Sequence, residues 1–456
     1  MSAIILLSIL GVVLLYMGLG NNKRLLAPVG ILGLAGAGAL SFLDRRPLPA
    51  WGHGAMAFDD LSVAFCVAMA GITLLLFVFG SDYYSRTQEN VAEHYALLVF
   101  SLTGAFLLTS YQNLLMLFLG IEVLSIPLYI LAGGKKRSYR SSEAGFKYFL
   151  LGSFATAFFL MGIALVYGMA GSFDLKVIGD YAAANAEHPA ALFLVGMFFI
   201  AVGLGFKVAA VPFHFWSPDV YEGAPTIITA FMSTVVKMGS FAAVYRLIGV
   251  HITALPPAVE RTLWAITILT LLIGNLVALR QSHFKRLMAY SSIAHTGFLL
   301  MAVLSGDALA GRALFYYTLT YALATVGLFV VFTVAKRAAN GDEHIRIFRG
   351  MFKSKPWLAA ATLIMLLSLA GIPPTAGFLA KYQVFVLAVQ NGYVWSTLFA
   401  AVMAVLGIYY YLKVIRETFT TNEEGAVLQL NATNTAVIAV CGVGALLLGL
   451  WPMGLI

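Results

Sequence analysis

The chain has 456 residues, of which 61% are hydrophobic and only 11% are charged. A soluble domain carries roughly 25% charged residues, so this composition excludes a water-soluble protein and indicates an integral membrane protein. The formal net charge is +8, but the basic residues fall mostly between apolar runs, so the charge does not indicate binding to nucleic acid.

The apolar runs have the length of membrane-spanning helices. Most contain about 18 to 25 residues, which suits a hydrocarbon layer about 30 Å thick. Backbone groups in lipid must find partners within their own segment, so we expect helices and an all-α polytopic fold in one membrane domain, residues 1–456. The first 20 residues have no basic stretch and no small-residue cleavage site, so a retained helix is expected rather than a signal peptide. The fourteen predicted spans are 3–20, 25–43, 61–80, 94–110, 112–132, 143–169, 191–216, 226–248, 260–279, 288–306, 311–335, 357–389, 393–418 and 434–452.

The basic residues predict how these spans are oriented. With the N-terminus outside, 18 of the 28 basic residues lie in cytoplasmic connections and 6 lie in outer ones, as the positive-inside rule requires. We therefore expect a multi-pass protein of the bacterial inner (plasma) membrane with both termini on the outer, periplasmic side. The remaining basic residues fall inside spans and are Lys147, Lys207, Lys237 and Lys381.

The first charged group near the bilayer centre is a carboxylate. An ionisable residue there costs about 2.5–3.5 kcal/mol on insertion scales, so it needs a partner, water or a proton-carrying role. Glu122 lies about ten residues into the fifth span, about 15 Å deep, and is predicted to pair with Lys207 of the seventh span; the alternative is a carboxylate satisfied by hydrogen bonds between packed helices. Lys207 precedes Pro212, and a proline-broken helix is tolerated in a membrane where the backbone lines a polar cavity. A purely structural Glu122–Lys207 bridge is the alternative.

Three weaker candidates surround this pair. Glu143 and Lys147 in the sixth span have the i,i+4 spacing of an ordinary helix ion pair, and either that role or a place on a proton path is possible. His214 follows the break in the seventh span and is either a packing residue or a proton relay. Asp219 and Glu222 are expected in the cytoplasmic connection, as capping or solvated loop residues, with a chemical role as the alternative.

The second half of the chain repeats these features. Lys237 lies in the middle of the eighth span with no acidic neighbour in its own helix, and is either a proton relay or a structural residue. His295 lies mid-span beside serine and threonine, and is either a packing residue or a relay. Lys381 follows the Pro373–Pro374 pair in the twelfth span, and is either a relay or a lysine that reaches the outer interface. No histidines have metal-ligand spacing and two cysteines are too few for an iron–sulfur site, so no metal or cofactor site is expected.

The two broken spans, each with a lysine, are five spans apart. Because five is odd, consecutive five-helix units must cross the membrane in opposite directions, and paired broken helices in inverted units mark the binding site of transporter folds. We predict inverted repeats at 94–248 (spans 4–8) and 260–418 (spans 9–13), preceded by three helices in 1–93 and followed by a C-terminal helix at 434–452.

These motifs together resemble a known family. The Glu122 helix, the segment from Lys207 through Pro212 into HFWSPD, the Lys237 helix, and GIPP followed by Lys381 are similar to the antiporter-like membrane subunits of NADH–quinone oxidoreductase (respiratory complex I). Related cation/proton antiporters share the pattern. The similarity covers spans 4–13, and the GFLAKYQVF segment is closest to the subunit N branch, since the subunit M branch typically has glutamate where Lys381 stands.

The resemblance implies a function in proton translocation. It implies that protons enter from the cytoplasm, that Glu122 and Lys207 form a switch, that Lys237 is the central relay and that Lys381 is the outer exit. NADH, FMN, iron–sulfur clusters and quinone would then be bound by partner subunits of the translocase, and this chain would contact neighbouring membrane subunits and lipid. The alternatives are a subunit of a secondary Na⁺/H⁺ antiporter and a membrane scaffold whose polar residues only hold helices together.

Overall fold

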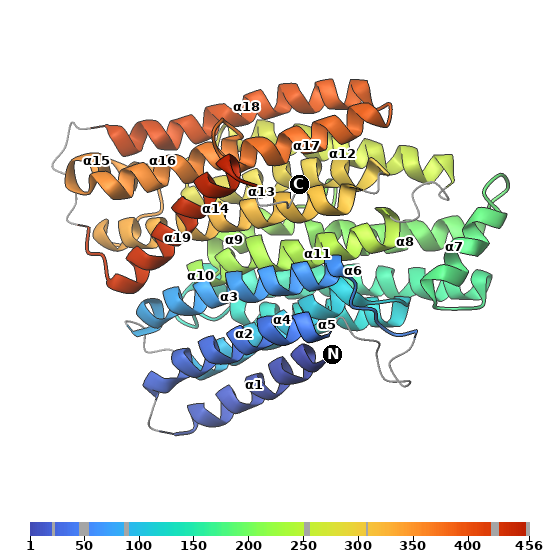
Figure 1. Cartoon of the computed structure of the whole chain (residues 1–456), viewed down its shortest axis with the longest axis horizontal. Coiled ribbons are helices and arrows are strands. Elements are labelled where there is room, and N and C mark those ends of the chain that lie inside the picture. Colours follow the sequence, from blue (N-terminus) through green and yellow to red (C-terminus); the bar gives the residue numbers. More distant parts are fainter. Residues whose placement is uncertain are drawn as a thin grey trace.

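The computed structural model describes residues 1–20, 23–44, 54–85, 91–249, 256–306, 309–420 and 428–452. Within these ranges the regular elements are helices, joined by isolated backbone bridges. Most of the long helices run roughly side by side along the longest axis of the molecule (Figure 1). Arg45, Arg46 and Arg86, which enter the count of basic residues, lie outside the described residues.

The helices follow the predicted spans closely. In the described part of the chain, 12 helical segments are long and apolar enough to cross a membrane, and three shorter apolar helices accompany them. α1 (Ser2–Gly18) is the predicted first span, and α16 (Pro356–Ala370) and α17 (Ala376–Gln390) together form the predicted twelfth. The 12 segments are α2 (Leu26–Leu43), α3 (Asp60–Ser85), α4 (Val91–Ser110), α5 (Leu114–Ala132), α6 (Tyr139–Ala170), α8 (Ala191–Val208), the segment Thr226–Gly249, α12 (Pro257–Ala278), α13 (Phe284–Leu304), α14 (Ala310–Ala338), α18 (Val394–Phe419) and α19 (Ala432–Leu450).

Both predicted helix breaks are present. α8 ends at Val208 because Ala209 adopts the left-handed conformation (φ 56°), and α16 ends at Ala370 because Gly371 does so (φ 79°). A left-handed alanine costs about 1–2 kcal/mol, so the packing around Ala209 must hold it there. The chain resumes in the short helix α9 (Trp216–Gly223) after the first break and in α17 after the second.

Several short elements differ from the sequence prediction. Asp219 and Glu222, expected in a loop, lie on α9. The predicted connection 170–190 contains the amphipathic helix α7 (Leu175–Ala184), whose first turn is capped by the Asp174 side chain. Lys285, counted as a residue of a cytoplasmic connection, is the second residue of α13 and is 2% exposed. Helices as short as α7 and α9 contain no long apolar run, so a search for membrane spans misses them.

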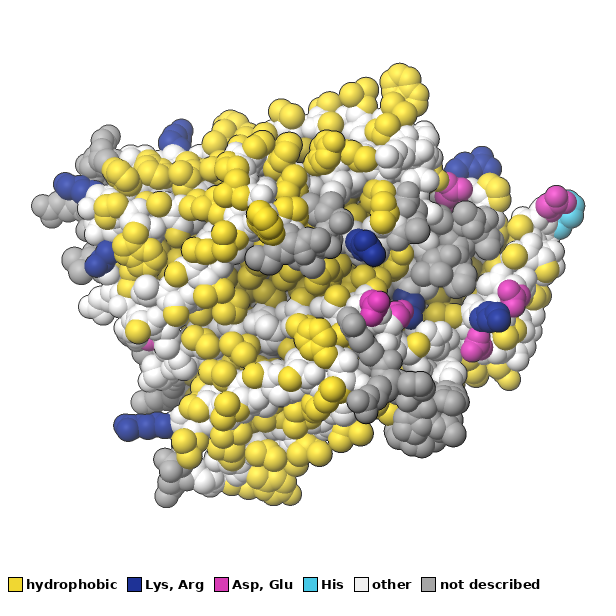
Figure 2. All heavy atoms as spheres, viewed as in Figure 1, with side chains coloured by type: hydrophobic (Ala, Val, Ile, Leu, Met, Phe, Trp, Pro, Cys, Tyr) yellow, Lys and Arg dark blue, Asp and Glu magenta, His cyan; other side chains and the backbone are white. Residues whose placement is uncertain are grey.

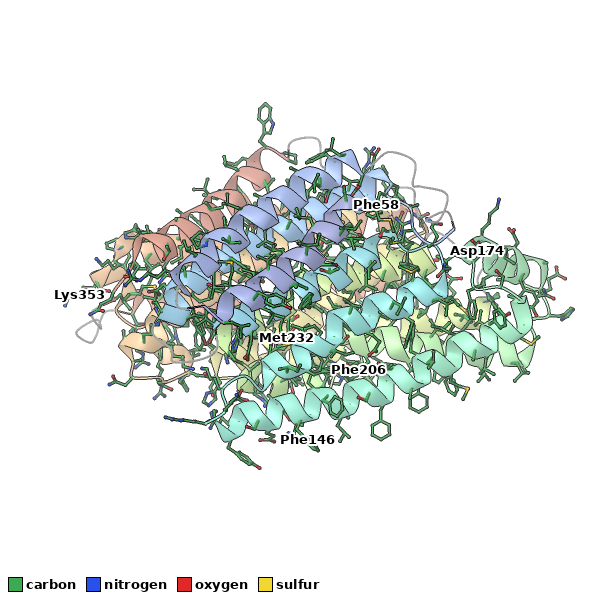
Figure 3. The ribbon with its side chains drawn as sticks, turned by 90° about the horizontal axis from the view of Figure 1, so that it is seen from below. Phe58, Phe146, Asp174, Phe206, Met232 and Lys353 are labelled. Carbon is green, nitrogen blue, oxygen red and sulfur yellow. The ribbon has the colours of Figure 1, made fainter. Side chains whose placement is uncertain are left out.

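The segment Thr226–Gly249 forms the centre of the bundle with α13 and α14. It consists of α10 (Thr226–Phe231), a π-helical stretch Met232–Val236, α11 (Lys237–Val244) and a second π-helical stretch Tyr245–Gly249. Its most apolar 18-residue window is 100% buried, compared with 33% for α6 at the periphery. In Figure 3, Phe206 and Met232 lie between the end that carries Lys353 and the end that carries Phe58 and Asp174.

The outer surface is suited to lipid or to other membrane proteins. Apolar side chains on α1, α5, α6, α8 and α18 are exposed, and Figure 2 shows hydrophobic side chains over most of one face, with charged side chains mainly towards the two ends. Helices that are apolar on their outward faces as well as towards the core are typical of membrane spans. The structure therefore confirms the polytopic all-α fold.

Two backbone bridges recur with a constant spacing along the chain. Asn113 pairs antiparallel with Asp174, and His283 pairs in the same way with His344, each residue 170 positions further on. The flanking hydrogen bonds keep this shift: Leu114 N donates to Phe173 O (3.0 Å) and Phe284 N to Glu343 O (2.8 Å), while Leu175 N donates to Gln112 O (3.0 Å) and Ile345 N to Ser282 O (2.9 Å). The first bridge thus joins the residue before α5 to the chain after α6, and the second joins the residue before α13 to the chain after α14.

Close helix contacts follow the same shift. A Cβ atom on Gly104 of α4 would lie 2.2 Å from the backbone nitrogen of Leu124 on α5. A Cβ atom on Gly274 of α12, 170 residues later, would lie 2.5 Å from the backbone nitrogen of Ala294 on α13. Only glycine allows either pair of helices to approach so closely.

Candidate functional site

Lys207 lies in the last turn of α8, just before the first break, and is 6% exposed. Its Nζ donates to Ser125 Oγ of α5 (2.8 Å) and to the Tyr148 hydroxyl of α6 (3.3 Å). Glu122, its predicted partner, accepts a hydrogen bond from Thr156 Oγ1 instead (2.8 Å), and among the described residues no ion pair joins it to Lys207. Ser125 stands one helical turn after Glu122, so it lies between the two charged groups.

An aromatic stack holds Tyr148 against the broken helix. The Tyr148 ring stacks on the Trp216 ring of α9 (centroids 4.6 Å apart, planes at 12°). Trp216 Nε1 donates to the carbonyl of Phe206 in α8 (2.9 Å). The stack therefore ties both halves of the broken helix to α6 and sets the position of the hydroxyl that Lys207 contacts.

Lys237 is the first residue of α11 and is 5% exposed. Its Nζ donates to the Ser292 carbonyl (2.5 Å) and to Thr296 Oγ1 (2.9 Å), and lies 5.4 Å from the centre of the Tyr321 ring. Thr296 Oγ1 in turn donates to the Val208 carbonyl (2.8 Å), the last of α8. One hydroxyl group thus connects Lys237 with the broken helix that carries Lys207.

His295 joins two helices through both of its ring nitrogens. Nδ1 lies 2.8 Å from the Tyr317 hydroxyl of α14, and Nε2 lies 3.1 Å from the Tyr411 hydroxyl of α18. The Tyr411 hydroxyl is also hydrogen-bonded to Ser291 Oγ. A neutral imidazole has one donor and one acceptor nitrogen, so this chain of groups is able to take up a proton at one end and release one at the other.

Lys381 lies on α17 after the second break and is 7% exposed. Its Nζ donates to the carbonyls of Leu369 (3.1 Å) and Ala370 (2.8 Å), the last two of α16, and lies 5.2 Å from the centre of the Phe298 ring. Carbonyls at a helix C-terminus carry a partial negative charge that favours a cation. The side chain points back to the break and does not reach towards the outer interface.

Lys147 belongs to a group of charged residues that links three helices. Its Nζ lies 2.7 Å from Glu143 Oε1 and 2.7 Å from Asp219 Oδ2 of α9. Asp219 Oδ1 and Glu222 Oε2 lie 2.9 and 3.0 Å from the Arg286 guanidinium of α13. The predicted i,i+4 pair is thus present but is only part of the network.

A second charged group adjoins this network. Lys285 donates to the carbonyls of Glu222 (2.9 Å) and Ala224 (2.5 Å), and lies 3.9 Å from the Glu343 carboxylate. Lys336 also pairs with Glu343. Burial alone would raise the pKa of Glu343, but these two ammonium groups hold the pKa below its ordinary value, so Glu343 is an ionised anchor.

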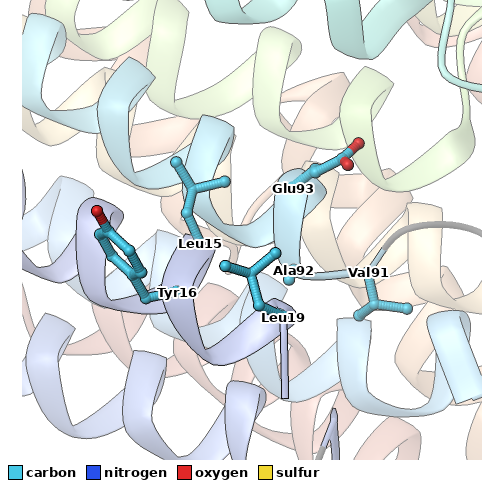
Figure 4. Close-up of a pocket in the computed structure, with 7 residues that line it drawn as sticks. Leu15, Tyr16, Leu19, Val91, Ala92 and Glu93 are labelled. Carbon is cyan, nitrogen blue, oxygen red and sulfur yellow. The ribbon is translucent and has the colours of Figure 1, made fainter. Parts of the chain in front are cut away.

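His214 stands apart from the lysines. It is 5% exposed, packs against the Phe215 ring (4.5 Å) and, among the described residues, has no hydrogen-bond partner for Nδ1. A groove of about 410 Å³ at the end of α1 and the start of α4 is also separate (Figure 4). Its lining residues include none of the candidate residues.

Comparison with known proteins identifies the family. Residues 111–407 match the sequence model of the NADH:quinone oxidoreductase/Mrp antiporter membrane region. The chain belongs to this antiporter family. The matched range contains every candidate residue of the site.

Relatives in this antiporter family match the chain over nearly its whole length. The NADH-quinone oxidoreductase subunit N of Cytophaga hutchinsonii is 39% identical, over 99% of this chain and 98% of the relative. The subunit N of Trichlorobacter lovleyi is 38% identical, over 98% and 93%. A chain of respiratory complex I from Thermus thermophilus with bound aureothin is 35% identical, with a TM-score of 0.84 and coverage of 99% and 98%. The family resemblance drawn from the motifs is therefore confirmed.

Other antiporter-family structures share the fold at lower identity. A chain of the Mrp complex from Dietzia sp. DQ12-45-1b has a TM-score of 0.82 at 20% identity, over 98% of this chain and 94% of that one. At this identity the likeness shows the fold alone.

The sequence did not single out four of the hydroxyl groups that contact the candidate residues. Ser125, Tyr148 and Thr156 surround Lys207 and Glu122, and Tyr411 contacts His295. Ser125 has a weak signal, because it lies three residues after Glu122 and so on the same helix face. Tyr411 has none, because the helix that carries it is far from His295 in sequence.

Proposed function

We propose that this chain is the proton-translocating, antiporter-like subunit, of the subunit N type, of a bacterial NADH–quinone oxidoreductase in the inner membrane. Its relatives at 35–39% identity carry that name, and the 35% identical structure is a chain of respiratory complex I. NADH, FMN, iron–sulfur clusters and quinone are assigned to partner subunits, and electron transfer there drives this chain. It contributes to the enzyme as a membrane subunit among other membrane subunits.

The observation that carries the proposal is a set of three buried lysines bound only to neutral groups. In the described residues, Lys207, Lys237 and Lys381 contact hydroxyls, carbonyls and aromatic rings, and no carboxylate lies within ion-pair distance. A buried ammonium without a counter-charge is poised to give up its proton. Arginine in these places would stay charged, whereas lysine is able to cycle.

The proposed proton path follows these contacts. Glu122 approaches Lys207 to stabilise its ammonium form and moves back to Thr156 to release the proton. The proton then passes to Lys237 by way of Thr296 and water, and to Lys381 by way of His295 and the tyrosine hydroxyl at its Nδ1. The Glu143–Lys147 pair acts on the uptake side, and His214 is a further relay at the first break.

The proposed architecture consists of two inverted five-helix units at 94–248 and 260–418, with helices 1–93 before them and 434–452 after them. The constant shift of 170 residues between matching backbone contacts supports this division. With both termini outside, Lys353 lies on the cytoplasmic side and α7 on the outer side.

Co-purification tests the function against the alternative of a secondary Na⁺/H⁺ antiporter. The chain, tagged and extracted from native membranes, is expected to bring flavin and iron–sulfur proteins with it. In vesicles, that assembly is expected to build a membrane potential when NADH and quinone are added. A preparation that lacks flavin but exchanges Na⁺ for H⁺ would support the antiporter instead.

A further inference from the structure

The two broken helices have the same backbone pattern, shifted by 162 residues. Ala209 N donates to Phe206 O, and Gly371 N donates to Ser368 O. Ala210 N donates to Gly205 O (2.8 Å), and Ile372 N donates to Leu367 O (3.0 Å). Adding 162 to the number of each of these four residues in the first unit gives the matching residue in the second unit.

This shift relates Asp219 to Lys381, since 219 plus 162 is 381. The nearby aromatic residues agree, because Trp216 of α9 maps onto Phe378 of α17. In the adjacent helix, where the shift is 170, Lys147 of α6 maps onto Tyr317 of α14. The Lys147–Asp219 ion pair thus stands in the first unit where Tyr317 and Lys381 stand in the second.

We propose that Asp219 is a positioning residue for proton uptake, which holds Lys147 at the cytoplasmic mouth of the first unit as the inverted counterpart of the Lys381 site. This inference rests on the function and orientation proposed above. It assigns to Asp219 a role that its position in a predicted loop did not suggest.

The contacts explain why Asp219 has this effect and Glu143 does not. Glu143 and Lys147 are on the same helix, so their ion pair does not locate Lys147 relative to any other helix. Asp219 is on α9, and its carboxylate is held from the other side by Arg286 of α13 (2.9 Å). Arginine stays protonated at all relevant pH values, so the anion beside Lys147 is fixed.

The position of Lys147 suits proton uptake. Its side chain is 38% exposed, so water is able to deliver a proton to it. The next residue, Tyr148, stacks on Trp216 of the same helix α9 and accepts the hydrogen bond from Lys207. In each transfer Lys147 would pass one proton by way of water and the Tyr148 hydroxyl to neutral Lys207 and take one from cytoplasmic water, and the Glu143 and Asp219 carboxylates would return it to the ammonium form.

The test uses the intact membrane complex in vesicles, with charge moved per electron pair as the readout. Asp219→Asn is expected to lower proton translocation about tenfold, within the range of a lost proton-transfer group, and Asp219→Glu to restore most of it. The control is Asp180→Asn. It removes the same charge from the exposed side of α7, outside the charged network, so translocation should stay within about twofold.

A double variant separates positioning from a merely structural role. If Asp219 acts through Lys147, then Lys147→Met and Asp219→Asn together should lose no more than either alone. Losses that multiply, or equal translocation by Asp219→Asn and Asp180→Asn, would overturn the inference. Lys207→Ala in the same assay tests the proposed function separately. If protons do not pass through Lys207, this variant will translocate normally, whatever the result for Asp219→Asn.

Discussion

The buried lysines are solvated by the protein in place of water. Lys237 and Lys381 each donate two hydrogen bonds to carbonyl or hydroxyl oxygens and face an aromatic ring. Hydrogen bonds to a charged group contribute about 1.5–3 kcal/mol each, so these contacts reduce the cost of burying a cation but do not fix its charge as a carboxylate would. The residues are therefore stable in the membrane and still free to release a proton.

Removing either member of the Glu122–Lys207 pair should stop translocation. Lys207→Ala and Glu122→Ala are each expected to lower NADH-driven proton translocation at least about tenfold, because the switch loses one of its two charges. Membrane potential in vesicles with equal amounts of assembled complex is the measurement. Lys176→Ala, on the exposed face of α7, is the control and should behave as the unaltered protein. Normal translocation by either fully assembled variant would contradict the switch.

A second change tests whether Lys381 must lose its proton. Lys381→Arg keeps the positive charge but replaces it with a guanidinium that scarcely deprotonates, so translocation should fall nearly as far as in Lys381→Ala. The potential built up per electron pair is compared in the two variants. If the arginine variant works as well as the lysine form, the residue serves only as a fixed charge.

At the residue scale, the sequence revealed the charged groups and the Glu143–Lys147 ion pair, but not the contacts of the buried lysines. Lys207, Lys237, Lys381 and Glu122 stood out because charge in an apolar run is costly. Serine, threonine and tyrosine are common in spans, and the direction in which each points depends on helix packing. The pairing of Glu122 with Thr156 could not be predicted for that reason.

At the scale of elements, long apolar runs predicted the spans and prolines predicted the breaks. The π-helical stretches before and after α11 were not predictable, because a π turn depends on packing and has no composition of its own. They lie in a segment buried on all sides, where the surrounding helices fix the backbone. α7 and α9 were missed because they are 10 and 8 residues long.

The close helix contacts at Gly104 and Gly274 give a test at this scale. Alanine at either position would place a Cβ within 2.2–2.5 Å of a neighbouring backbone nitrogen, and such overpacking costs about 1–3 kcal/mol. We expect Gly104→Ala and Gly274→Ala each to lower the temperature at which the purified complex dissociates. Gly71→Ala and Gly168→Ala are the controls, because a Cβ there meets nothing within 4 Å. Equal effects at all four glycines would show that the contacts do not matter.

At the scale of the whole molecule, the proposed orientation assigns one end to each side of the membrane. Lys353 on α15 (Met351–Ser354) and Glu187 after α7 are both exposed, and the labels α15 and α7 mark opposite ends of the helices (Figure 1). The two native cysteines are buried, so they add little background to thiol labelling. This makes the orientation directly measurable.

Cysteine substitution at these positions tests the orientation. In intact cells whose outer membrane has been removed, a membrane-impermeant maleimide should label Glu187→Cys and not Lys353→Cys. After the membrane is opened, both variants should react, which controls for reactivity. The reverse pattern would place the N-terminus in the cytoplasm and would also reverse the direction of the proposed proton path.

The constant shifts have a consequence for the bilayer that surrounds the chain. Matching residues of the two units are 170 positions apart up to Asp174 and 162 positions apart from Gly205 onwards. The two units therefore differ in length in the connection before α8 and at the start of α8. The spans on either side keep similar lengths, with 19 and 21 residues in α5 and α13 and 32 and 29 in α6 and α14. The two proposed units, which would cross the membrane in opposite directions but match in length, would require the same hydrocarbon thickness. Lipids with longer or shorter acyl chains would then mismatch both units together, at a cost of fractions of a kcal/mol per ångström.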